Sequence, residues 1–244
     1  MFKIVVLNIG FIIVVSIPIF LPALAAKYFD STALEIALSA FGILLCSVYL
    51  ASAAVTIKSI SDYSSFEFVD IFKNLKTAWP AGIFMAFFVF IIFLVMTVIL
   101  PFYLTMDSPL GIVFAAIVFW MLILALLSFQ FYFSVYARLG SKIKKSIKKC
   151  MIISLDNSGF AVFFLIHNLI ALIISVVFVF MFPGPVGIFL YLDEALRLRL
   201  LKYDWLEANP DANRRKIPWD ALLIEEREKT GTRSFRNFIF PWKD

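Results

Sequence analysis

The sequence predicts an all-α fold, a polytopic membrane helix bundle with six transmembrane helices, two cytoplasmic amphipathic elbow helices and a cytoplasmic C-terminal tail. Two features of composition predict it. Of the 244 residues, 62% are hydrophobic and only 16% are charged, whereas about a quarter of a globular domain is charged. Mean hydropathy is +0.95. This length suits one compact membrane domain.

A third observation is the arrangement of long apolar runs between short polar links. A transmembrane helix needs about 20 mainly apolar residues. We expect spans at about 4–26, 33–56, 80–104, 109–137, 159–182 and 185–201. Together they make a transmembrane domain over 1–203, followed by a tail over 204–244.

The first run resembles a signal peptide, because Ala23-Leu24-Ala25 mimics a cleavage site. Apolar cores of signal peptides are only about 7–15 residues long, and the run over 4–26 is longer. We therefore expect a retained first helix. At the start of the second span, Thr32-Ala-Leu-Glu35 reads as a capping box, which assigns Glu35 to the helix start.

The sixth span is the weakest of the six. Only 186–192 is uniformly apolar before Asp193 and further charged residues follow. On a helix Asp193 can pair with Arg197, four positions later. A segment this short crosses the membrane only by thinning the bilayer locally.

Lysine and arginine positions predict the orientation, because cytoplasmic loops are enriched in both. With six spans and a cytoplasmic N-terminus, 21 of the 22 basic residues face the cytoplasm and only Lys27 faces outside. A five-span chain would export the basic tail. Six crossings with both termini cytoplasmic is therefore the prediction.

The loop between spans four and five is strongly basic. On a helix, Leu139, Ile143, Ile147 and Cys150 share one face. The lysines around that face are Lys142, Lys144, Lys145, Lys148 and Lys149. Such a segment lies along a membrane surface and favours anionic head groups. The alternative is a specific site for a lipid head group or a partner.

The loop before the third span has a similar pattern. Ser64-Ser65-Phe66-Glu67 resembles a capping box. Apolar residues then recur at helical spacing, at Phe68, Ile71, Phe72, Leu75 and Trp79. We expect a second surface elbow helix there.

Polar residues inside spans are few, and such residues can mark a transport path. The candidates for an intramembrane polar path are Asn8, Gln130, His167 and Asn168. The alternative role for each is a hydrogen bond between helices. The sequence has one histidine, two cysteines and none of the common nucleotide-binding, hydrolase or zinc motifs. We therefore expect no enzyme activity, no metal, no cofactor and no nucleic-acid binding.

The tail is polar but ends in aromatic residues. Pro218 suits the first turn of a short helix over about 218–229. The candidate docking residues of the tail are Trp219, Leu223, Phe235, Phe238, Phe240 and Trp242. Large apolar residues at a terminus need a surface, which can be the membrane or a cytoplasmic partner.

Two motifs resemble the YesL-like family of bacterial membrane proteins. They are the proline-containing end of the first span, at 22–26, and the elbow at 71–79. The chain departs from the family at 19–21, where Ile-Phe-Leu replaces the frequent Thr-Ile-Gly. The resemblance covers about 1–203.

This resemblance implies a non-enzymatic accessory or scaffold protein of the bacterial inner membrane. Genes of the family commonly lie beside those of carbohydrate ABC transporters, so the implied partners are transporter subunits, besides membrane lipids. The alternatives are a small-solute permease with a polar path through the bundle and a lipid-binding membrane protein.

Overall fold

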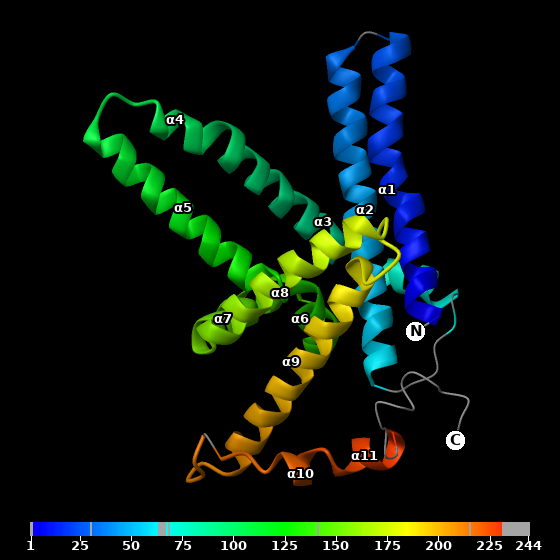
Figure 1. Cartoon of the computed structure of the whole chain (residues 1–244), viewed down its shortest axis with the longest axis vertical. Helices are drawn as coiled ribbons and strands as arrows, with labels where there is room; N and C mark the ends of the chain where they lie inside the picture. Colours follow the sequence, from blue (N-terminus) through cyan, green and yellow to red (C-terminus); the bar gives the residue numbers. More distant parts are fainter. Residues whose placement is uncertain are drawn as a thin grey trace. The chain divides into compact units, whose positions relative to one another are not determined.

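The structure is a computed structural model that describes residues 2–29, 31–62, 67, 69–140, 142–214 and 216–230. All regular elements of these residues are helical (Figure 1). The chain divides into two compact units, Met1–Leu196 and Arg197–Asp244. The first contains most of the helices and is described first.

The first unit begins with three long helices. They are α1 (Phe2–Phe29), α2 (Thr32–Ser61) and α3 (Val69–Leu94). The cap of α2 is Ser31, whose Oγ accepts a hydrogen bond from Leu34 N at 3.4 Å. The cap is thus Ser31 and not Thr32, the cap that the sequence predicted. Thr32 is the first residue of the helix, and Glu35 lies in its first turn.

Small residues let these three helices pack closely. The buried residues of α2 include Ala51, Ser52, Ala53 and Ala54. On α3, a Cβ added at Gly82 would lie 2.5 Å from the backbone Cα of Val48, so no larger residue fits there. Close approach through small residues is the usual way in which membrane helices associate.

A π-helical turn, η1 (Val95–Ile99), continues α3 into α4 (Leu100–Leu104). Pro101 explains this wider turn. A proline ring clashes with the carbonyl four residues earlier in an α-helix, and one π turn gives that carbonyl more room. The run Val69–Leu104 is therefore one continuous helical rod.

The second half of this unit contains α5 (Pro109–Phe129), α6 (Tyr132–Leu139), α7 (Ile143–Asp156), α8 (Ser158–Val177) and α9 (Gly184–Ala208). The short α6 is its core, since Tyr132 through Tyr136 are all buried. Aromatic contacts join Tyr132 to Phe84 of α3 and Phe133 to Phe189 of α9.

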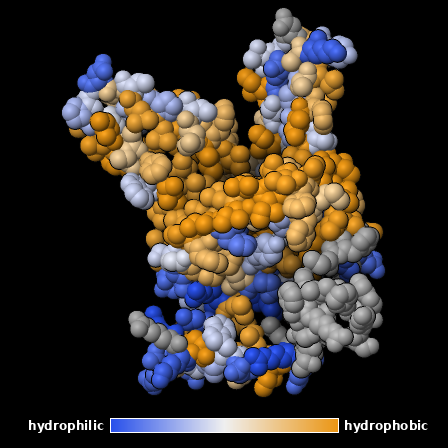
Figure 2. Space-filling model, in the orientation of Figure 1, coloured by the Kyte–Doolittle hydropathy of each residue, from blue (hydrophilic) through white to orange (hydrophobic). Residues whose placement is uncertain are grey.

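Five helical segments are long and apolar enough to cross a membrane: Lys3–Phe29, Thr32–Ser61, Val69–Leu104, Pro109–Phe129 and Ser158–Val177. In Figure 2, hydrophilic residues gather at the α1–α2 and α4–α5 turns and hydrophobic residues cover the helices between. The predicted class, an all-helical membrane protein, is therefore confirmed, although the number of spans is not.

The helix boundaries differ from the predictions in three places. The first predicted elbow is not a separate helix, because 69–79 forms the first turns of α3. The predicted fourth span is divided at Gln130 into α5 and α6. The predicted sixth span belongs to α9, which is not among the five spanning segments. Its charged second half explains this result.

The second unit contains the end of α9 and two short helices, α10 (Trp219–Leu222) and α11 (Ile224–Thr230). The helix predicted over 218–229 is therefore two helices that meet at Leu223. Trp219 is 37% exposed. The remaining candidate docking residues, Phe235, Phe238, Phe240 and Trp242, lie outside the described residues.

Candidate functional site

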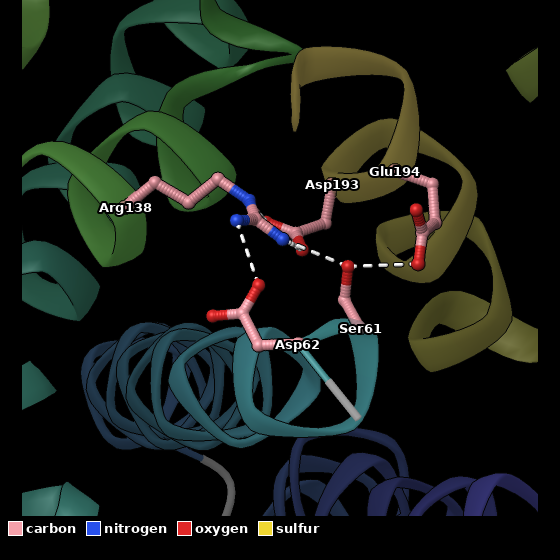
Figure 3. A network of polar contacts seen from close by, with 5 residues as sticks. All are labelled: Ser61, Asp62, Arg138, Asp193 and Glu194. Carbon is pink, nitrogen blue, oxygen red and sulfur yellow. Dashed lines mark hydrogen bonds and ion pairs between the residues drawn. The ribbon is translucent and has the colours of Figure 1, made fainter. Parts of the chain in front are cut away.

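The most concentrated polar cluster of the first unit is centred on Arg138 (Figure 3). Arg138 lies in the last turn of α6, and Gly140 ends that helix with a positive φ of 76°. Ser61 and Asp62 come from the end of α2, and Asp193 and Glu194 come from α9. We name these five residues the arginine network.

The guanidinium group of Arg138 donates to three side chains. Its Nε and Nη2 bind the two carboxylate oxygens of Asp193, at 2.8 and 2.5 Å. Nη1 binds Asp62 Oδ1 at 3.0 Å, and Nη2 also binds Ser61 Oγ at 2.7 Å. Ser61 in turn donates to Glu194 Oε1 at 2.8 Å. A bidentate arginine–carboxylate pair is geometrically specific as well as electrostatically favourable.

Burial makes the pair between Arg138 and Asp193 the tightest part of the network. Their side chains are 9% and 2% exposed, whereas that of Asp62 is 39% exposed. Burial acts to lower the pKa of Arg138, but hydrogen bonds and charges from Asp193 and Asp62 outweigh it and leave the pKa above its usual value. The guanidinium group therefore stays charged.

The arginine network can hold three helices together. Both oxygens of Asp193 accept hydrogen bonds from Arg138, so this carboxylate is committed to one cation. Among the described residues, no group of three or more His, Cys, Asp or Glu side chains could hold a metal ion. The network is a fixed joint between α2, α6 and α9.

Sequence reasoning missed this joint. It paired Asp193 with Arg197 on the same helix, whereas the structure pairs Asp193 with Arg138, 55 positions earlier. An available signal was that Asp193 follows an apolar run and Arg138 follows a span. A buried acid needs a cation, and Arg138 is the basic residue that directly follows the predicted fourth span.

The basic helix α7 is the second candidate surface. Its buried side comprises Ser146, Cys150, Ile153 and Ser154. On the other side Lys142, Lys144, Lys145 and Lys148 are exposed, and Lys149 is half-buried. Of the predicted apolar face only Cys150 is buried, since Ile143 and Ile147 are partly exposed and Leu139 lies in α6. Burial raises the pKa of the Cys150 thiol to about 12.

Two of the predicted polar-path residues lie together. Gln130 Nε2 donates to Leu127 O at 3.0 Å and to Ala161 O of α8 at 2.8 Å. Asn168 Nδ2 donates to Gln130 Oε1 at 3.1 Å. These contacts join α8 to the break between α5 and α6, as a hydrogen bond between helices would.

The other two polar-path residues have different surroundings. His167 lies beside the rings of Phe163 and Phe164 and meets Tyr191 edge-on, with ring centroids 5.2 Å apart. Asn8 is fully buried and bonds to the turn between α8 and α9. No hydrogen bond among the described residues joins Asn8 to Gln130 or Asn168.

An apolar hollow is present elsewhere in this unit. It has a volume of about 290 Å³ and lies between α3, η1 and α5. Its lining includes Phe88, Ile91, Val95 and Leu122 and none of the predicted polar residues. This hollow suits hydrocarbon better than a polar solute.

Comparison with known protein families, curated proteins and solved structures finds no match for this chain. The resemblance to the YesL-like family therefore stays a prediction that depends on the two motifs alone.

Proposed function

We propose that this protein is a non-enzymatic scaffold of the bacterial inner membrane, with both termini in the cytoplasm. It presents a cytoplasmic cationic surface, the exposed lysines of α7, to anionic lipid head groups and to a transport partner. The distribution of basic residues supports this orientation, because it places nearly all of them on one side.

One observation carries the scaffold proposal. The lysines of α7 are exposed while the polar groups of the arginine network are turned inward and bonded to one another. The chemistry available to a partner is therefore positive charge on a rigid helix. Each lysine near an anionic membrane contributes about 1 kcal/mol, so four exposed lysines make a substantial anchor.

Lipid binding can be tested by comparing two double variants, each of which removes two lysine charges. Lys144→Gln with Lys145→Gln removes two charges from α7, and Lys73→Gln with Lys76→Gln removes two exposed charges from α3. We expect the α7 pair alone to reduce the anionic lipid that copurifies, as measured by mass spectrometry of the intact complex. Equal retention of anionic lipid by both variants would remove the head-group role of α7.

The partner class is supported by the family resemblance. On that basis we propose subunits of a carbohydrate ABC transporter. Affinity capture from native membranes should recover such subunits, and a chain ending at 232 should recover fewer of them. Undiminished recovery would discard the docking role of the tail. A reporter fused after residue 244 that is active in the periplasm would contradict the cytoplasmic orientation itself.

A further inference from the structure

The turn between α8 and α9 lies deep against α1. In Figure 1 it lies beside the lower part of α1 and α2, far from the α1–α2 turn at the top. Asn8 Nδ2 donates to Met181 O at 3.1 Å and to Pro183 O at 2.8 Å. Phe180 and Phe11 of α1 form an edge-to-face pair at 5.9 Å.

These contacts fix the depth of the turn. At 1.5 Å per residue, Asn8 lies about 9 Å from the start of α1 and about 30 Å from its end at Phe29. If α1 crosses a hydrocarbon layer about 30 Å thick, the turn lies within the half of the layer where α1 begins. A turn that connected two full spans would instead lie beside Phe29.

The length of α9 agrees with this depth. From Gly184 to Asp193 the helix rises about 14 Å. Gly184 lies against Asn8, and Asp193 lies in the arginine network at the end of α2. The end of α2 and the start of α1 belong to the same end of their hairpin. The start of α8 is near the same face, because Ala161 in its first turn accepts a hydrogen bond from Gln130, eight residues before Arg138.

The composition of the turn suits hydrocarbon rather than water. No charged residue occurs from Val176 to Leu192. The side chains of Phe178, Val179 and Phe182 are 56%, 65% and 49% exposed. By contrast, Lys27 precedes the α1–α2 turn and Asp107 lies in the α4–α5 turn. Several large apolar side chains exposed next to one another indicate an apolar surrounding.

Broken helix is tolerated at membrane depth only where its backbone groups find partners. At the end of α8, Phe180 N bonds to Ser175 O and Val179 N to Val176 O, which is the Schellman pattern. Ser175 Oγ accepts from Gly184 N at 3.0 Å.

Asn8 completes this set of partners. Besides donating to two carbonyls of the turn, it accepts from Val186 N at 3.1 Å through Oδ1 and so caps α9. Ser175 and Asn8 are both 0% exposed. Gly184 is required here because its φ is +64° and an added Cβ would overlap the Asn8 side chain.

We propose that α8 and α9 form a re-entrant hairpin whose apolar turn docks among the acyl chains of the leaflet in which α1 begins. Four segments then cross the membrane fully: α1, α2, the rod Val69–Leu104 and α5. The occupant of the turn's exposed surface is lipid hydrocarbon, because the turn is uncharged and its apolar side chains at Phe178, Val179 and Phe182 are exposed. This proposal does not depend on the scaffold function.

Cysteine accessibility tests the depth of the turn. Phe182→Cys replaces an exposed residue of the turn, and Asp107→Cys places a matched cysteine in the α4–α5 turn, both in a Cys46→Ala background. Sealed membrane vesicles of each orientation are treated with a membrane-impermeant maleimide. We expect Asp107→Cys to react from one side only and Phe182→Cys to react from neither until detergent is added. Reaction of Phe182→Cys from either side would overturn the proposal.

A nitroxide attached at the same cysteine separates lipid from protein as the surrounding. Frequent collision with oxygen and loss of collision with a water-soluble nickel chelate would support contact with acyl chains. Frequent collision with the nickel chelate, or rare collision with both, would overturn it. Unchanged elution in gel filtration confirms that each variant is folded before either measurement.

Discussion

At the scale of single residues, the buried guanidinium group of Arg138 depends on two carboxylates for its charge balance. It is shared by a buried carboxylate, Asp193, and a partly exposed one, Asp62. Removing one partner of a buried pair leaves an uncompensated charge, which is more costly than removing both. The two acids should therefore respond very differently to substitution.

We expect Arg138→Met to destabilise the protein by about 3–5 kcal/mol, because Asp193 is left buried without its cation. Asp62→Asn should cost about 1 kcal/mol or less, since an exposed ion pair contributes little. Thermal unfolding of the purified variants measures both. The double variant Arg138→Met with Asp193→Leu should recover most of the loss. A double variant as unstable as Arg138→Met alone would contradict the buried-pair explanation.

Cys150 provides a second test at this scale. It is fully buried in α7, and burial raises the pKa of its thiol to about 12. The thiol is then protonated at pH 7 to 9, and the thiolate is the reactive form. We expect no maleimide reaction at Cys150 in the native protein and full reaction after denaturation.

The control for Cys150 is Lys144→Cys, an exposed position on the same helix. It should react readily across the same pH range. If Cys150 reacted as fast as this control, α7 would not pack as the structure describes.

At the scale of elements, sequence periodicity predicted helix both at α7 and at 69–79, but not that 69–79 continues into the third span as α3. Ile143, Ile147 and Cys150 recur at helical spacing next to lysines within α7, whereas Leu139, predicted on the same face, ends α6. The segment at 69–79 has the same spacing but packs on α2, where Ser52 Oγ donates to Ile71 O at 2.6 Å. Local spacing cannot distinguish a membrane surface from a neighbouring helix.

Pro80 shows a further limit of local reasoning. A proline normally marks a helix end, and the third span was predicted to begin there. In the structure α3 continues through it, and Tyr136 Oη donates to Thr77 O at 3.0 Å in the preceding turn. A neighbouring helix can thus supply a partner where proline loosens the helix's own bonds.

The α8–α9 turn should depend on the hydrogen bonds of Asn8. Asn8→Leu keeps the branched shape and the number of heavy atoms of the side chain but removes three hydrogen bonds, to Met181, Pro183 and Val186. Each buried group left without a partner costs about 1–3 kcal/mol. We expect a lower unfolding temperature and faster hydrogen exchange at Val186.

Asn168→Leu is the matched control, because it removes one hydrogen bond, to Gln130. A single bond between membrane helices contributes about 0.6 kcal/mol on average. Equal losses for Asn8→Leu and Asn168→Leu would show that the turn does not depend on Asn8.

At the scale of the whole molecule, composition predicted the helical membrane class because it needs only summed hydrophobicity. The number of crossings was less predictable. A run of apolar residues has the same appearance whether it crosses a bilayer or turns back within it. What distinguishes the segment that follows α8 is a set of distant contacts, from Asn8 to Pro183 in the turn and from Arg138 to Asp193 in α9. Sequence spacing does not reveal contacts over such separations.

The positions of the polar side chains within the membrane segments bear on the permease alternative. A polar path needs groups that face a common passage. Asn8 holds the α8–α9 turn, whereas Gln130 and Asn168 join α8 to the break after α5. The apolar hollow beside α5 offers no polar lining. These positions favour packing roles over conduction.

We therefore expect liposomes that contain only this protein to show no more sugar or small-ion flux than protein-free liposomes. His167→Ala should leave that baseline unchanged, because His167 lies among the rings of Phe163, Phe164 and Tyr191. Entrapped-solute release measured by fluorescence tests both, with a known channel protein as the positive control. Flux that depends on this protein and falls with His167→Ala would replace the scaffold proposal with the permease alternative.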